Sequence, residues 1–147
     1  MTKRAGISAS NDPGLSQLIQ SKADAVCLVA KSWDYHVKVA LGCTNEENLE
    51  SIRDSVKAVV EAGKLSMVDC EHFFDGYKAN PDYAIACAKE AYLAALALEP
   101  GHEDALYNLS LLQGGAAAAP DTNSSKQPEP AADQQATAMP LPPSPPV

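Results

Sequence analysis

The chain has 147 residues, with 11 Lys and Arg against 19 Asp and Glu and a formal net charge of −8. This acidity, with no basic run longer than Lys3-Arg4, argues against binding to nucleic acid through phosphate neutralisation. The apolar runs fall far short of the roughly 20 residues that cross a bilayer, so we expect no membrane span. The N-terminus lacks the apolar core of a secretory signal, which favours a cytoplasmic protein while leaving an organelle open.

The first predicted helix follows an Asn-Asp-Pro-Gly turn at residues 11–14, a pattern that is typical of a helix start. Its apolar residues recur at helical spacing, at Leu15, Leu18 and Ile19. The continuous apolar run Ala25–Ala30 comes next, between two lysines. Its length and its β-branched residues predict a strand buried on both faces, as in a parallel sheet.

A second helix is predicted to begin after Thr44, because Glu47 three residues later completes a capping box. Gly63 is suited to end this helix. The apolar face of the helix is expected to hold Leu49, Ile52, Val56, Val59 and Val60. A second strand is then predicted over residues 64–70.

Another helix is expected to start at Asn80-Pro81, since Pro is tolerated in the first turn, and to end at Pro100-Gly101. A last short helix is predicted over residues 105–113. Strands that alternate with helices predict an α/β fold with two parallel strands. Two strands alone do not make a stable parallel sheet, so we expect exposed sheet edges that invite a protein partner or self-association.

Composition changes after Gly114, where eight of the 11 prolines lie between Pro120 and Pro146 among Ala, Gln and Ser. Such a stretch cannot bury enough apolar surface to offset chain entropy, so residues 114–147 are predicted to form a disordered tail. The last prolines also contain P-x-x-P arrangements suited to polyproline II recognition. No basic residue flanks them, and we favour disorder without a ligand.

The four cysteines are far apart and form no C-x-x-C pair. In a chain without a secretory signal, this spacing indicates reduced, mostly buried thiols rather than a zinc site or disulfides. The residues concerned are Cys27, Cys43, Cys70 and Cys87.

Polar residues follow both predicted strands, in KSWDYH at residues 31–36 and in DCEH at residues 69–72. Either cluster alone is more often a solvated loop. In α/β barrels, however, the residues just past the carboxyl ends of strands face the active site. Two such clusters in one chain therefore favour a functional site.

Four segments carry a resemblance: TKRAGISASNDPGL, KSWDYHVKVAL, NEENLESIRDSV and, above all, DCEHFFDGYKANPDYA. They resemble consecutive parts of the citramalate synthase family, within the isopropylmalate and homocitrate synthase group. The catalytic domain of that family is a pyruvate-carboxyltransferase-type (β/α)8 TIM barrel. The resemblance implies that residues 1–88 form part of such a barrel, with about two of its parallel strands.

The resemblance also implies an acyltransferase that condenses acetyl-CoA with a 2-oxo acid, pyruvate in the citramalate case, with the help of a divalent metal. Glu71 matches an acidic residue of the substrate pocket and is the candidate catalytic residue. The candidate substrate-binding residues, carried over from the family's motifs, are Arg4, Lys31, Ser32, His36 and His72.

The motifs that hold the metal in this family, Leu-Arg-Asp-Gly and His-x-His, do not occur in the sequence. We therefore expect no metal ligands and no cofactor in this chain, and no activity from the chain alone. Acetyl-CoA and the 2-oxo acid are expected as partners only where a complete barrel forms. Assembly of partial barrels from several chains is one way to complete it.

A second, less specific resemblance begins at Glu90, where EAYLAALALEPGHEDALYNLSLL is similar to the back half of a tetratricopeptide repeat. Residues 89–113 are accordingly predicted to form a separate helical hairpin. About three such repeats are needed for a continuous core, so one copy is expected only to cover the structure beneath it. This resemblance supports the alternative of a non-catalytic helical-repeat interaction protein.

Overall fold

The computed structural model describes residues 1–112 and shows an α/β fold with one two-stranded parallel sheet. Strand β1 (Ala25–Lys31) pairs with β2 (Leu65–Glu71) in unbroken register, from Ala25 opposite Leu65 to Lys31 opposite Glu71. Both predicted strands are confirmed; β1 ends one residue later than expected, and β2 begins and ends one residue later. The N-terminal segment lies along the other edge of β1, where the backbone N–H of Thr2 donates to the carbonyl of Val29 at 3.3 Å.

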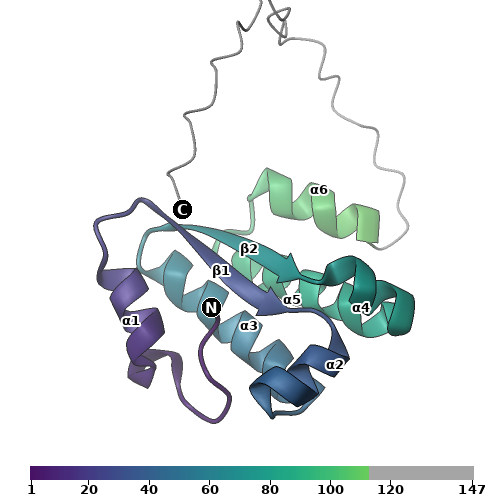
Figure 1. Ribbon diagram of the computed structural model, residues 1–147. Helices are drawn as coiled ribbons and strands as arrows, with labels where there is room; N and C mark the ends of the chain where they lie inside the picture. The colour runs from purple at the N-terminus through teal and green to yellow at the C-terminus, as the bar shows by residue number, and fades with distance from the viewer. Residues whose placement is uncertain (113–147) are drawn as a thin grey trace, which may run out of the picture. The chain divides into compact units, whose positions relative to one another are not determined.

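Helices flank the two strands (Figure 1). In chain order they are the 3-10 turn η1 (Ala9–Asn11), α1 (Pro13–Gln20), α2 (Asp34–His36), the π-helical turn η2 (Val37–Leu41), α3 (Asn45–Glu61), α4 (Phe73–Ala79), α5 (Pro81–Leu98) and α6 (Glu103–Leu112). Within residues 1–112 no helix combines the length and apolar character needed to cross a membrane.

Three of the four predicted helix starts are confirmed by their caps, and the last helix, α6, begins two residues earlier than predicted. Asp12 accepts a hydrogen bond from the backbone of Leu15 at the start of α1. At α3, Thr44 and Glu47 form the expected reciprocal capping box. Asn80 caps α5, with Pro at its first position. Helix α4, directly after β2, was not predicted from the sequence.

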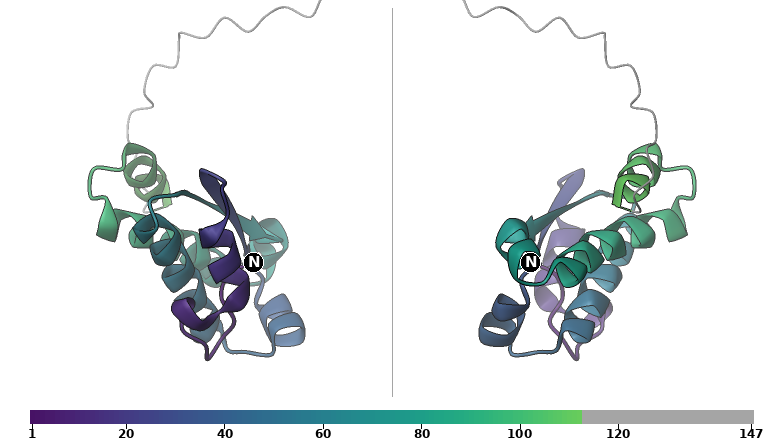
Figure 2. Two further views of the ribbon diagram at one scale, coloured as in Figure 1. Left: turned by 90° about the vertical axis from the view of Figure 1, so that its left-hand side faces the viewer. Right: turned by 90° about the vertical axis from the view of Figure 1, so that its right-hand side faces the viewer.

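One face of the sheet is buried beneath α3 and α5, which lie on the same side of the strands (Figures 1 and 2). Val26, Leu28 and Ala30 of β1 point to this side and are at most 4% exposed. The helices complete this core with Ile52, Val56, Val59, Tyr83, Cys87, Ala91 and Ala94. The core therefore fixes the strands from one side only.

The opposite face of the sheet is open among the residues that the structure describes. Leu65 and Met67 of β2 are 57% and 48% exposed, and Cys27 of β1 is exposed beside them. The prediction that the first strand is buried on both faces is therefore wrong. Side chains alternate between faces along a strand, and α3 and α5 cover only one of them.

The prediction of mostly buried thiols is also wrong. Cys87 is buried, Cys43 and Cys70 are partly buried, and Cys27 lies on the open face. All four are free thiols. The prediction failed at Cys27 because a continuous apolar run predicts burial for every residue in it. In the strand, side chains alternate between the two faces, and Cys27 points away from the helices.

The predicted boundary at residue 88 falls within α5, which is one continuous helix. Its inner face packs against α3 and β2, and Arg53 of α3 forms two 2.8 Å hydrogen bonds with Glu90 of α5. Helix α6 packs on α5, so the two form a hairpin. The boundary and the tetratricopeptide likeness stay predictions, and the predicted disordered tail with its P-x-x-P motifs lies outside the described residues.

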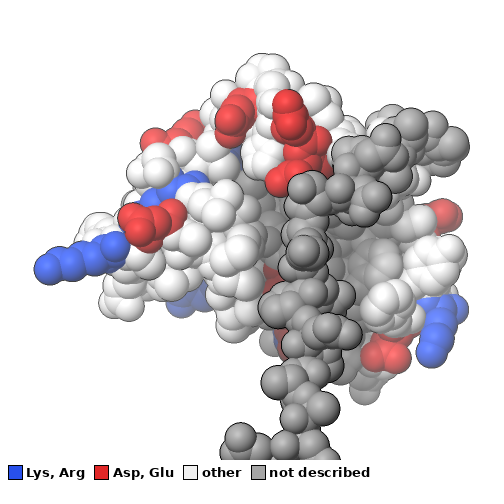
Figure 3. Space-filling view, turned by 90° about the horizontal axis from the view of Figure 1, so that it is seen from above, with Lys and Arg blue, Asp and Glu red and all other residues white. Residues whose placement is uncertain are grey.

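The surface of the described residues carries charges of both signs. On the face shown in Figure 3, acidic and basic side chains are scattered over the part of the surface that grey atoms leave visible. Several basic side chains pair with acidic groups, as Lys3 does with Asp54 at 3.3 Å.

Candidate functional site at the strand ends

The carboxyl ends of β1 and β2 bring together five of the six predicted site residues. We call Lys31, Ser32, His36, Glu71 and His72 the strand-end cluster. Since the strands are parallel and in register, their ends meet at one edge of the sheet, next to α2 and α4 (Figure 1). The structure thereby places residues 40 positions apart side by side.

Lys31 and Glu71 are direct partners in the parallel pairing, and the Lys31 ammonium donates a hydrogen bond to a Glu71 carboxylate oxygen. Both side chains are partly exposed, Lys31 at 19% and Glu71 at 33%. The hydrogen bond from Lys31 lowers the pKa of Glu71 below its ordinary value, and the nearby charges of Lys31, His72 and His36 add to this effect against partial desolvation. Glu71 is therefore held in its ionised form at neutral pH.

Ser32 ties the two strand ends together from within. It is fully buried, its backbone N–H donates to the carbonyl of Glu71 at 3.3 Å, and its hydroxyl donates to the same oxygen at 2.9 Å. In this arrangement Ser32 supports the backbone of Glu71. Its predicted role in contacting substrate stays a prediction.

The two histidines of the cluster form an aromatic group with Trp33. The rings of His36 and His72 meet edge to face with centroids 4.6 Å apart, and Trp33 lies 4.6 Å from His36. His72 has a left-handed backbone, with φ of 57°, and its Nδ1 lies 3.0 Å from Asp75. Such a conformation is uncommon for a residue other than Gly and costs of the order of 1 kcal/mol or more. Strain of this kind is concentrated at functional sites.

Gly76 lets α4 approach the end of β1 closely. A Cβ atom at this position would lie 2.3 Å from the carbonyl oxygen of Ser32 and 3.0 Å from the Cα atom of Trp33. Such contacts are far shorter than van der Waals separation, so only Gly fits here. The contact sets the position of α4, whose preceding residue is His72.

Arg4, the sixth predicted site residue, is joined to a different partner. Its Nε donates to Asp12 at 3.1 Å, and its backbone N–H donates to the same carboxylate. The backbone N–H of Leu15, followed by these contacts with Arg4, lowers the pKa of Asp12 to about 2 despite burial. Arg4 thus stabilises the start of α1, and its role toward substrate stays a prediction.

The residues that the structure describes do not fit a divalent metal. Among them, no three His, Cys, Asp or Glu side chains are grouped closely enough to hold an ion. In the strand-end cluster, the Glu71 carboxylate accepts a hydrogen bond from the Lys31 ammonium, which competes with any metal for that carboxylate.

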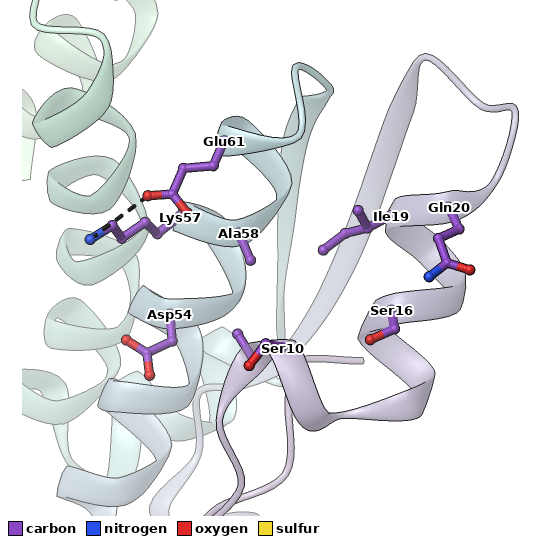
Figure 4. Close-up of a pocket in the computed structure, with 9 residues that line it drawn as sticks. Ser10, Ser16, Ile19, Gln20, Asp54, Lys57, Ala58 and Glu61 are labelled. Carbon is purple, nitrogen blue, oxygen red and sulfur yellow. Dashed lines mark ion pairs between the residues drawn. The ribbon is translucent and has the colours of Figure 1, made fainter.

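A surface hollow lies elsewhere on the described residues. A groove of about 480 Å³ lies between α1 and α3 and is lined by Ser16, Asp54, Lys57 and Glu61 among others (Figure 4). Lys57 and Glu61 form an ordinary surface ion pair at 3.9 Å within it. No member of the strand-end cluster lines this groove. The site residues predicted from the sequence therefore do not coincide with this groove.

Parallel strands backed by helices, with ionisable side chains gathered at their carboxyl ends, are the arrangement found in α/β enzymes. The comparison with curated proteins is more specific. Over 90 residues, 61% of the chain, it is 47% identical to the (R)-citramalate synthases of Streptomyces coelicolor and Geobacter sulfurreducens, and 41% identical to that of Aquifex aeolicus. The resemblance to the citramalate synthase family is thus confirmed.

The chain spans about 17% of the length of these curated relatives. No family profile and no solved structure matches it.

Sequence reasoning missed several residues that shape the site. Asp75 and Gly76 belong to α4, which has too few residues for a clear apolar period. Asn48 is buried on the inner face of α3, four residues before Ile52. Its position on the apolar stripe was the available signal, because a polar residue there must find a hydrogen-bond partner.

Proposed function

We propose that residues 1–88 form one wall of the 2-oxo acid pocket of a citramalate synthase-type acyltransferase, which condenses acetyl-CoA with pyruvate or another 2-oxo acid. The observation that carries this proposal is the Lys31–Glu71 pair at the strand ends of a chain that is 47% identical to an (R)-citramalate synthase over 90 residues. In a (β/α)8 barrel, the carboxyl ends of strands form the mouth where substrates bind.

In this proposal Lys31 and Glu71 act as a unit. The Lys31 ammonium has further N–H donors beyond the one given to Glu71, and these suit the carboxylate of a 2-oxo acid. Lys31 keeps Glu71 ionised, which allows Glu71 to accept a hydrogen bond or a proton while making it a weaker base. Glu71 is the proposed catalytic residue because its carboxylate lies at the strand ends and Lys31 holds it ionised.

The aromatic side chains of Trp33, His36 and His72 lie beside the Lys31–Glu71 pair. His36 and His72 lie close enough for their charged forms to lower the pKa of Glu71. An imidazole N–H can donate a hydrogen bond, so both side chains are suited to contact an anionic substrate. The Trp33 ring packs against the His36 ring.

The remaining parts of the reaction must come from outside the described residues. The resemblance implies a divalent metal, which would act as a Lewis acid toward the 2-oxo acid, and this chain lacks the family's metal motifs. We therefore propose that the chain alone does not turn over, and that activity requires a complete barrel around the open face of the sheet.

A segment exchange tests the proposal. The 90-residue segment of the Streptomyces coelicolor synthase that matches this chain is replaced by the segment of this chain, and coenzyme A release is measured with acetyl-CoA and pyruvate. We expect turnover, a loss of about a hundredfold or more in kcat with Glu71→Gln, and a raised KM for pyruvate with Lys31→Met. The surface pair supplies matched controls, Glu61→Gln and Lys57→Met, which should leave both parameters unchanged. A folded exchange protein without turnover, or one indifferent to Glu71→Gln, would refute the proposal.

The exposed face of the sheet favours a second role, association with a further copy of the chain. Leu65, Met67 and Cys27 form an apolar surface that a monomer leaves in water. Beside it, a groove of about 400 Å³ lies between β2, α5 and α6. Association through this face is compatible with the enzyme proposal, because both require the open side of the sheet to be covered. A purely helical-repeat role has less support, since the inner face of α5 is occupied by α3 and β2.

A further inference from the structure

The carbonyl oxygen of Lys31 is held by side chains from two helices. Asn48 of α3 donates to it through Nδ2 at 2.8 Å, and the Sγ of Cys87, from α5, lies 3.7 Å from the same oxygen. The Nδ2 of Asn48 also donates to the hydroxyl oxygen of Tyr83 at 2.8 Å. We propose that Asn48, supported by Tyr83 and Cys87, is a positioning residue that fixes Lys31 beside Glu71.

Asn48 acts on Lys31 through the peptide group that joins Lys31 to Ser32. The carbonyl of Lys31 and the N–H of Ser32 belong to the same planar group, so rotation of one moves the other. Its carbonyl end is bound by Asn48 and Cys87, and its N–H end donates to Glu71. The peptide is thus clamped between the helix layer and β2. The clamp sets the direction in which the Lys31 side chain leaves the backbone.

The three supporting side chains are buried and uncharged. Asn48, Tyr83 and Cys87 are 1%, 7% and 0% exposed. Burial raises the pKa of Cys87 to about 12 and raises the pKa of Tyr83 as well, so both keep their protons at neutral pH. The Cys87 thiol therefore remains a donor toward the Lys31 carbonyl. No charge from this group competes with Lys31 for Glu71.

Burial of Asn48 destabilises the fold in one respect, which the hydrogen bonds from its Nδ2 must offset. It is buried on α3, and within residues 1–112 its Oδ1 has no hydrogen-bond partner. A buried polar atom without a partner destabilises the fold, and an apolar residue at this position would avoid that loss. The two donors of Asn48 are the feature that an apolar residue lacks, and both serve the end of β1.

This inference rests on the proposed function in one respect, namely that Lys31 and Glu71 face substrate. The effect of Asn48 on the pair itself is measurable without substrate, in the full chain. We suggest following the titration of the Glu71 carboxyl carbon by ¹³C NMR, because the hydrogen bond from Lys31 is the largest cause that lowers the pKa of Glu71. Failure of the segment exchange and failure of this inference are therefore distinguishable.

The test compares Asn48→Leu, which removes both donors at similar volume, with Ser55→Ala. Ser55 is a matched control because it is fully buried on the same helix and hydrogen-bonds to Lys3 and Ser51, away from the strand end. We expect Asn48→Leu to raise the pKa of Glu71 toward the ordinary value of 4.5, and Ser55→Ala to leave it unchanged while lowering stability.

Tyr83→Phe keeps the donor to Lys31 but frees the amide of Asn48, so a smaller rise in the pKa of Glu71 is expected. If Asn48→Leu does not fold, the pKa of Glu71 in Tyr83→Phe tests the inference in its place. A folded Asn48→Leu protein with the wild-type pKa at Glu71 would overturn the inference. An equal rise in Ser55→Ala would do so as well, since the effect would then reflect general loosening of the core.

Discussion

Replacing Gly76 by Ala tests the close contact between α4 and the end of β1. The added Cβ would lie 2.3 Å from the Ser32 carbonyl oxygen, about 1 Å inside the usual contact distance of 3.4 Å or more. That carbonyl belongs to a strand end held by hydrogen bonds to Glu71, so it cannot move aside freely. Overpacking of this kind costs about 1–3 kcal/mol or more, and the higher helix propensity of Ala returns about 1 kcal/mol at most.

We therefore expect Gly76→Ala to lower the free energy of unfolding by about 2 kcal/mol, or the melting temperature by roughly 8 °C for a domain of this size. Urea denaturation followed by circular dichroism measures the loss. Gly101→Ala is the matched control, because no atom lies within 4 Å of its Cβ, and it should change stability by less than about 0.5 kcal/mol. Equal stability of the two variants would show that α4 does not pack as closely as described.

Three further predictions follow from the charges, thiols and open face. The folded-state pKa of Asp12 is about 2 against an ordinary value of 3.8, so Asp12 contributes about 2 kcal/mol above pH 4, and this contribution is lost as the pH falls from 3.8 to 2. Asp12→Asn should remove this pH dependence while keeping an N-cap. The prediction is contradicted if the free energy of unfolding of the variant changes between about pH 2 and pH 5 by the same amount as that of wild type. Cys27 is exposed and Cys87 buried, so iodoacetamide should label Cys27 in the native chain and Cys87 only on unfolding, as mass spectrometry of peptides can decide. Wild-type chain should associate as its concentration rises, and Met67→Lys should suppress this; light scattering that shows a monomer for both would argue against association through the open face.

Features that depend on local sequence could be predicted. The capping box of Thr44 and Glu47 was identified because its partners lie three residues apart, and the helix starts near Asp12 and Asn80 were identified from the turn and the proline that follow them. The two strands and their parallel arrangement followed from apolar runs separated by a helix. The meeting of Lys31 and Glu71 followed in turn, since parallel strands end at one edge of the sheet.

Features that depend on tertiary contact could not be predicted. The role of Gly76 lies in its distance to Ser32, which no local pattern contains. The exposure of Cys27 depends on which face of the sheet the helices cover, and an apolar run is the same in either case. Asn48 was overlooked because a periodic apolar face is identified by its apolar members.

The central claim is that the strand-end cluster forms one wall of an acyltransferase pocket and needs the rest of a barrel to act. Release of coenzyme A from acetyl-CoA and pyruvate, measured with purified chain and added Mg²⁺ or Mn²⁺, tests this most directly. We predict no release above the rate without protein, because the sequence lacks the family's metal-binding motifs. Turnover by the chain alone that disappears with Glu71→Gln would contradict the account.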